Sequence, residues 1–160
     1  MTGSSSATVP ALHLRPATVE DGRLLFNWVN QPDCLAASLE TTRPVEWAEH
    51  LGWLENRVSS SECGIWIATF AGAPIGQVRA EIGADDQLYV SIYIDAPARG
   101  KGHGTAMLAA LATESVARWP GASLVARVRN GNVSSRKLFE TAGYRLTDAN
   151  DDYRTYVRAG

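Results

Sequence analysis

The chain has 160 residues, of which 45% are hydrophobic, and this suits one domain with a sizeable core. Its formal net charge of −2 argues against a nucleic-acid partner held by bulk positive charge. It has no apolar run of membrane-spanning length and no signal-peptide core, so we expect a cytoplasmic protein without a membrane partner. We predict a mobile, Ser-rich tail over residues 1–9 and one domain over residues 10–160. Cys34 and Cys63 lack metal-site spacing, so we predict free thiols and no bound metal.

The first part of the chain predicts a strand and two helices. Residues 12–15 alternate in polarity, as a strand does. Thr18 and Asp21 are spaced as a capping signal for the first helix. The apolar side of that helix carries Leu24, Leu25, Trp28 and Val29. Residues 30–42 are predicted to be irregular, and Pro44 suits the first turn of the second helix.

The second predicted helix has two stripes of side chains. Its apolar stripe consists of Trp47, Leu51, Leu54 and Val58. A neighbouring stripe, rotated toward a different surface, consists of His50, Trp53 and Arg57. Side chains of this second stripe are therefore available to a ligand without loss of core packing.

From residue 64 onward the pattern changes to that of strands. Residues 64–70, 75–82 and 87–94 predict three consecutive strands, separated by turns at 71–74 and 83–86. The third strand has one apolar face, and its other face carries Tyr89, Ser91 and Tyr93. A helix over 105–119, a strand over 124–128, a short helix over 132–142 and a hairpin over 144–157 follow.

This order of elements predicts the fold class. Strands on both sides of helix 105–119 imply a crossover, so strands 87–94 and 124–128 are expected to run parallel. The earlier strands are expected to be antiparallel. We therefore predict an α/β fold with a mixed, mostly antiparallel central sheet and helices on both faces.

The most informative motif is the glycine-rich turn of residues 99–105, between a predicted strand and a predicted helix. Such a turn presents free amides and the positive end of the helix dipole, which together bind diphosphate. The turn lacks the Lys-Ser/Thr pair of a Walker A loop and the spacing of a dinucleotide fingerprint. It does match Gln/Arg-x-x-Gly-x-Gly/Ala through Arg99, Gly102 and Gly104.

That match resembles motif A of the GNAT superfamily of acetyl-CoA-dependent N-acetyltransferases. A second segment, residues 130–144, resembles the later Asn-x-x-(Ala/Ser)…Glu-x-x-Gly-(Phe/Tyr) motif of the same family. The resemblance extends from about Leu12 to about Arg158. It implies the GNAT fold, in which the central parallel strand pair splays apart and pantetheine enters the gap. A homodimer is compatible with this resemblance.

The resemblance also implies the residues that bind acetyl-CoA. The backbone of the glycine turn would hold the diphosphate, and the backbone near residues 92–94 would meet the acetyl carbonyl and pantetheine. An amide aimed at the thioester oxygen would stabilise the developing oxyanion. Lys137 can alternatively be a solvated surface lysine. The implied cofactor residues are Ile92, Tyr93, Ile94, Arg99, Gly100, Lys101, Gly102, His103, Gly104, Thr105, Asn132, Ser135, Lys137 and Phe139.

Two positions depart from the common catalytic pattern of the family. Tyr89 stands where many members carry Glu, and Phe139 stands where many carry a Tyr that acts as the general acid. The remaining candidates for base and acid chemistry are Glu81, Tyr89, Tyr93 and Ser134, with His50 as a further base. The alternative for Glu81 is an exposed strand-end acid, and for the tyrosines it is aromatic packing.

The acceptor would be a small-molecule amine. Trp-x-Asn followed by His-x-x-Trp resembles the acetyltransferases that modify nucleotide-linked amino sugars of nonulosonic acid routes. The implied acceptor residues are Trp28, Asn30, His50, Trp53 and Arg79, with Ser38 and Gln77 nearby. Two alternatives stay open: a protein N-terminal or ribosomal-protein acetyltransferase, and a catalytically silent acyl-CoA-binding module.

Overall fold

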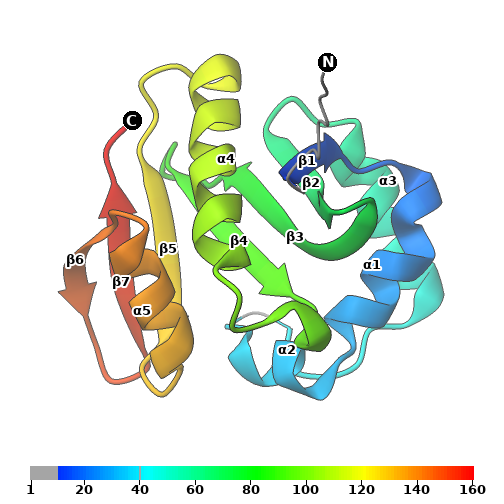
Figure 1. Cartoon of the computed structure of the whole chain (residues 1–160), viewed down its shortest axis with the longest axis horizontal. Coiled ribbons are helices and arrows are strands. Elements are labelled where there is room, and N and C mark those ends of the chain that lie inside the picture. Colours follow the sequence, from blue (N-terminus) through cyan, green and yellow to red (C-terminus); the bar gives the residue numbers. More distant parts are fainter. Residues whose placement is uncertain (1–10, 40) are drawn as a thin grey trace, which may run out of the picture.

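The computed structural model describes residues 11–39 and 41–160, so the predicted tail over residues 1–9 lies outside the described residues. The described chain forms a seven-stranded sheet in the order β1-β2-β3-β4-β5-β7-β6 (Figure 1). The strands are β1 (Leu12–Pro16), β2 (Cys63–Phe70), β3 (Ala73–Ile82), β4 (Leu88–Ile94), β5 (Leu124–Arg129), β6 (Arg145–Ala149) and β7 (Tyr153–Arg158). The helices are α1 (Gly22–Val29), α2 (Pro32–Ala37), α3 (Trp47–Val58), α4 (His103–Arg118) and α5 (Val133–Thr141), with single 3₁₀ turns at Val19–Asp21 and Ala96–Ala98.

The sheet confirms the predicted mixed topology. β4 and β5 run parallel, whereas the other neighbouring strands run antiparallel. The parallel pair is joined only at Leu88–Leu124 and Tyr89–Val125. Beyond these residues the two strands diverge, and this is the predicted splay.

Helices cover both faces of the sheet, as predicted. Figure 1 shows α4 and α5 in front of the strands. Met107, Leu108 and Leu111 of α4 are fully buried in the core on that side. A second core, on the opposite face, joins α1 and α3 to the strands through Leu25, Trp28, Leu54, Ile65, Ile67 and Tyr93. Because strand residues alternate between faces, β2 and β4 contribute to both cores.

The start of α1 follows the capping signal. Asp21 Oδ2 accepts a hydrogen bond from the Thr18 amide at 2.9 Å, and Thr18 Oγ1 accepts one from the Glu20 amide at 3.3 Å. Arg15 adds two hydrogen bonds to the Asp21 carboxylate at 2.7 and 2.9 Å, and these lower the pKa of Asp21. The cap therefore also ties the end of β1 to the helix.

The segment between α1 and α3 differs from the prediction in two ways. Residues 32–37, predicted to be irregular, form α2 with Pro32 in the first turn, where a missing amide costs nothing. Pro44 lies outside the helix that it was predicted to open, since α3 begins at Trp47. Asn30 explains the delay: its side chain accepts from the Val45 amide at 2.7 Å and donates to the Val45 carbonyl at 3.2 Å. This clamp holds the residues before α3 out of the helix.

The two stripes of α3 are also rotated from the prediction. The buried residues of this helix are His50 and Leu54, whereas Trp47, Leu51 and Val58 are half-buried. The His50 ring is 4% exposed and lies among Phe26, Trp47 and Trp53 at centroid distances of 5.6, 6.3 and 5.8 Å. No described group hydrogen-bonds to its Nε2. An imidazole that satisfies only part of its hydrogen-bonding capacity in an aromatic site is most stable when uncharged.

We expect His50 to make the fold acid-sensitive. Burial lowers the pKa of His50 from 6.5, so the unfolded chain binds this proton more readily than the folded one. The contribution of uncharged His50 to the free energy of unfolding is complete above pH 6.5 and is lost as the pH falls below this value. His50→Phe removes this titration. As the pH falls below 6.5, the free energy of unfolding of the variant is therefore expected to rise relative to that of the wild type by up to about 1.4 kcal/mol per pH unit. Urea unfolding at pH 7 and pH 5 measures the difference.

His13→Gln is the matched control, because His13 lies exposed on β1. It is expected to keep the pH dependence of the wild type. Parallel pH profiles for wild type and His50→Phe would contradict the burial argument.

Candidate active site

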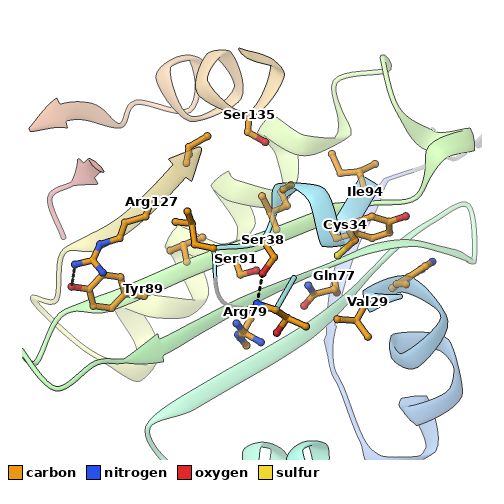
Figure 2. Close-up of a pocket in the computed structure, with 18 of the residues that line it drawn as sticks. Val29, Cys34, Ser38, Gln77, Arg79, Tyr89, Ser91, Ile94, Arg127 and Ser135 are labelled. Carbon is orange, nitrogen blue, oxygen red and sulfur yellow. Dashed lines mark hydrogen bonds between the residues drawn. The ribbon is translucent and has the colours of Figure 1, made fainter. Parts of the chain in front are cut away.

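A single cavity of about 1510 Å³ connects the glycine turn with the face of the sheet covered by α1, α2 and α3. Ligand pockets usually span about 300–1,000 Å³, so this one has room for two ligands side by side. Figure 2 shows labelled side chains from α1, α2, β3, β4, β5 and α5 around it. Tyr89 and Arg127 lie at one end, and Ile94 and Cys34 lie at the other. The cavity passes through the gap where β4 and β5 diverge.

The glycine turn has the geometry of an anion site. Gly100 and Gly102 have φ values of 76° and 81°, the left-handed region that favours glycine, and Gly102 is the N-cap of α4. Within the described residues, none of the amides from Gly100 to Thr105 donates a hydrogen bond. These free donors at a helix N-terminus fit a diphosphate.

Gly104 allows close packing of α4 at the same site. A Cβ at Gly104 would lie 2.8 Å from Leu138 Cδ1 and 2.9 Å from Ile94 Cδ1, both of which belong to cavity-lining residues. The helix can therefore approach α5 and the end of β4 only with glycine here. The residues present thus fit a cofactor with a diphosphate and a long narrow arm.

Most of the predicted cofactor residues line this cavity. They are Ile92, Tyr93, Ile94, Arg99, Gly100, Gly102, His103, Gly104, Thr105, Asn132, Ser135 and Phe139. Lys101 and Lys137 are exposed and lie outside the lining. The His103 ring packs on Phe70 at a centroid distance of 4.5 Å, which leaves its amide for the turn. The Asn132 side chain caps α5 by accepting from the Ser135 amide at 3.3 Å.

The Arg99 side chain leaves the glycine turn. Its Nε donates to the Ile94 carbonyl at 2.8 Å, its Nη2 forms an ion pair with Asp33 of α2, and its guanidinium lies 5.5 Å from the Tyr93 ring centroid. The Arg99 amide also donates to the Ala96 carbonyl at 3.2 Å, so the free amides of the turn begin at Gly100. The side chain instead ties α2 to the end of β4.

The two tyrosine candidates differ in their partners. The Tyr89 hydroxyl donates to Asp85 and accepts from Arg127 Nη2 at 3.1 Å, so its proton is already engaged. The hydrogen bond to Asp85 also raises the pKa of Tyr89. Tyr93 is 8% exposed, lines the cavity, and has no hydrogen-bonded partner among the described residues. Burial, followed by the nearby Asp33, raises the pKa of Tyr93 and keeps its hydroxyl protonated.

Glu81 and Ser134 also line the cavity, each with an identified neighbour. Glu81 lies 3.1 Å from Arg57 and 3.9 Å from Arg79, so two guanidinium groups share its carboxylate. Ser134 is exposed, and its hydroxyl donates to Asn132 Oδ1 at 3.3 Å. Phe139 is buried and packs on Tyr144 at a centroid distance of 5.0 Å.

The predicted acceptor residues are only partly brought together. Trp28, His50, Trp53 and Arg79 line the cavity, with Ser38 and Gln77, whereas Asn30 is held by Val45 outside the lining. Trp28 is core and packs on Tyr93 at 5.9 Å. The Trp53 ring contacts His50, and the Arg79 guanidinium lies 5.2 Å from its centroid. Trp53 therefore positions Arg79 instead of offering a free face for stacking.

Sequence reasoning missed a group at the Tyr89 end of the cavity, formed by Arg127, Tyr153 and Asp85. Arg127 of β5 and Tyr153 of β7 come together through the antiparallel register of these strands. Asp85 joins them from the turn between β3 and β4. The alternation of residues 125–129 signals that Arg127 leaves the core, but it does not signal which strands flank it.

The profile of the acetyltransferase (GNAT) domain matches residues 11–145. The chain belongs to the GNAT acetyltransferase family. It is thus an N-acetyltransferase whose acetyl donor is acetyl-CoA. A search of curated proteins gives no significant match.

Solved structures share the fold of this acetyltransferase at low sequence identity. Spermidine N-acetyltransferase from Vibrio cholerae, in complex with CoA and spermine, has a TM-score of 0.82 at 17% identity, over 92% of this chain and 95% of that one. The ribosomal L7/L12 alpha-N-protein acetyltransferase RimL, in complex with CoA, has a TM-score of 0.79 at 16% identity, over 92% of this chain and 93% of that one. The aminoglycoside acetyltransferase AAC(6')-Ib, in complex with CoA and kanamycin, has a TM-score of 0.78 at 18% identity, over 93% of this chain and 95% of that one. No described helix of the acetyltransferase is long and apolar enough to cross a bilayer.

Proposed function

We propose that this acetyltransferase modifies the primary amine of a small, phosphate-bearing acceptor, a nucleotide-linked amino sugar. Acetyl-CoA supplies the acetyl group as an activated thioester. The observation that carries the proposal is the charge pattern of the acceptor side of the cavity. Its arginines are Arg43, Arg57, Arg79 and Arg127, in a chain whose net charge is −2.

Three of the four carboxylates that line the cavity are engaged, and the fourth, Glu49 of α3, is exposed. Asp33 pairs with Arg99, Glu81 lies between Arg57 and Arg79, and Asp85 accepts from Tyr89. A polyamine or aminoglycoside acceptor carries several positive charges and needs carboxylates that are free to face it. A phosphate instead finds guanidinium groups, which bind it with charge-assisted hydrogen bonds. The charge pattern therefore favours an anionic acceptor.

The catalytic roles follow from the partners of each candidate. Tyr93 is the proposed acid, because its hydroxyl lines the cavity and holds its proton. Glu81 keeps Arg57 and Arg79 in place on the sheet face, and Tyr89 keeps Arg127 in place. Deprotonation of the acceptor amine then falls to water in the cavity, with Glu81 as the nearest carboxylate on the strand beside β4.

We expect kcat/KM for a uridine-diphosphate-linked 4-amino sugar to exceed that for N-terminal peptides and for spermidine. The expected margin is about tenfold or more, the equivalent of one additional charge-assisted contact. Arg79→Gln is expected to raise the acceptor KM and to leave the Kd for acetyl-CoA unchanged. Thiol release with each acceptor measures these constants.

Arg145→Gln is the matched control, since Arg145 is exposed on β6 and lies outside the cavity lining. It removes the same charge and is expected to leave KM as in the wild type. A tenfold advantage for peptides or for spermidine would overturn the choice of acceptor.

A further inference from the structure

Arg127 is held in place on the cavity wall without a directly paired carboxylate, and Asp85 reaches it only through the Tyr89 hydroxyl. Arg99 pairs with Asp33, and Arg57 and Arg79 share Glu81. Arg127 has no carboxylate within 4.0 Å among the described residues. Its guanidinium is therefore available to an external anion.

Arg127 is fixed by its neighbours on the sheet face. Its guanidinium carbon lies 4.7 Å from the Tyr89 ring centroid and 5.4 Å from the Tyr153 ring centroid. Its Nη2 donates to the Tyr89 hydroxyl (Figure 2), and that hydroxyl in turn donates a hydrogen bond to Asp85. Because the hydroxyl hydrogen points to Asp85, the Tyr89 oxygen presents its lone pairs to Arg127. The remaining N–H groups of Arg127 are thus oriented before a ligand arrives, which lowers the entropic cost of binding.

The geometry points to an anion subsite at Arg127, which binds a phosphate of the acceptor. Tyr89, Arg127, Tyr153 and Asp85 all line the same cavity as the glycine turn. Arg127 lies on β5, across the β4–β5 gap from Arg79 on β3. An acceptor held there by its phosphate can place its amine in the gap, next to the acetyl group. This inference rests on the proposed function, and it adds which residue recognises the anion.

The test is binding of uridine 5′-diphosphate to protein saturated with CoA. CoA occupies the glycine turn, so that turn cannot bind the probe. We expect calorimetry to show that the diphosphate binds and that uridine binds far more weakly. Arg127→Gln is expected to weaken the diphosphate by roughly 10–100-fold. Its Kd for CoA, which reports correct folding, is expected to match that of the wild type.

Two further variants keep the test decisive. Arg145→Gln removes one exposed positive charge outside the cavity and is expected to bind the diphosphate as the wild type does. Arg127→Lys keeps the charge but loses the planar contact with the two rings, so an intermediate affinity is expected; it decides the matter if Arg127→Gln does not fold. Equal diphosphate affinity in wild type and the Arg127 variants, or no binding by the CoA-saturated wild type, would overturn the subsite.

These outcomes are separable from those of the proposed function. If the diphosphate binds through Arg127 but no nucleotide-linked amino sugar is acetylated, the subsite stands and the acceptor is wrong. If the sugar is acetylated and diphosphate affinity does not depend on Arg127, the function stands and the subsite is wrong.

Discussion

Gly104→Val is expected to weaken the binding of acetyl-CoA by roughly 5–150-fold or more while the protein stays folded. A Cβ at this position already lies within 3 Å of Leu138 and Ile94, and the two additional methyl groups of valine extend further into the cavity wall. Overpacking of this kind costs about 1–3 kcal/mol, or roughly 5–150-fold in Kd when it falls on a binding site. Displacement of the free amides of the glycine turn adds to this loss. Calorimetry with acetyl-CoA measures the change, and circular dichroism reports the fold.

Gly102→Ala tests the same site by a different cause. Gly102 has open space around it but a φ of 81°, so alanine strains the backbone at the N-cap of α4. Gly121→Ala is the matched control, because Gly121 has a φ of 80° and open space between α4 and β5, outside the cavity lining. Both variants are expected to lose similar stability, and only Gly102→Ala is expected to lose affinity. Unchanged affinity in both Gly104→Val and Gly102→Ala would remove the assignment of the diphosphate to this turn.

The geometry of the glycine turn was predictable from sequence because the backbone determines it. Gly100, Gly102 and Gly104 are needed for two left-handed residues and one close helix contact, and no other residue type meets these needs equally well. A strand before the turn and a helix after it place the free amides at a helix N-terminus. The parallel β4–β5 pair follows from the same crossover.

The acceptor half was less predictable because side-chain partners distant in sequence decide it. Asn30 looked like a ligand contact, yet it clamps Val45, fifteen residues away. Arg99 sits in the phosphate motif, but its guanidinium pairs with Asp33. Arg127 and Tyr153 meet only through the register of β5 and β7, which depends on how the final hairpin folds back. Helical periodicity placed Trp47 in the core stripe and His50 beside it, whereas the structure buries His50 and leaves Trp47 half-buried.

Tyr93→Phe is expected to lower kcat by roughly 10²–10⁴-fold, the usual contribution of a positioned general acid. The phenylalanine ring keeps the packing against Trp28, so the second core is preserved. What is lost is the one phenolic hydroxyl of β4 that lines the cavity without a described protein partner. The raised pKa of Tyr93 keeps this proton available at neutral pH. The Kd for acetyl-CoA and the acceptor KM are therefore expected to change little, and steady-state thiol release separates kcat from KM.

Two hydroxyl deletions elsewhere show whether the effect belongs to Tyr93. Tyr156→Phe removes a buried hydroxyl that donates to Glu140, outside the cavity lining, and is expected to cost stability without changing kcat. Tyr89→Phe removes the oxygen that orients Arg127 and is expected to raise the acceptor KM more than it lowers kcat. A wild-type kcat in Tyr93→Phe would move the acid to Ser134, whose hydroxyl lines the cavity from α5. A fall in kcat with Tyr89→Phe and not with Tyr93→Phe would instead mean that the proton shared with Asp85 is the one transferred.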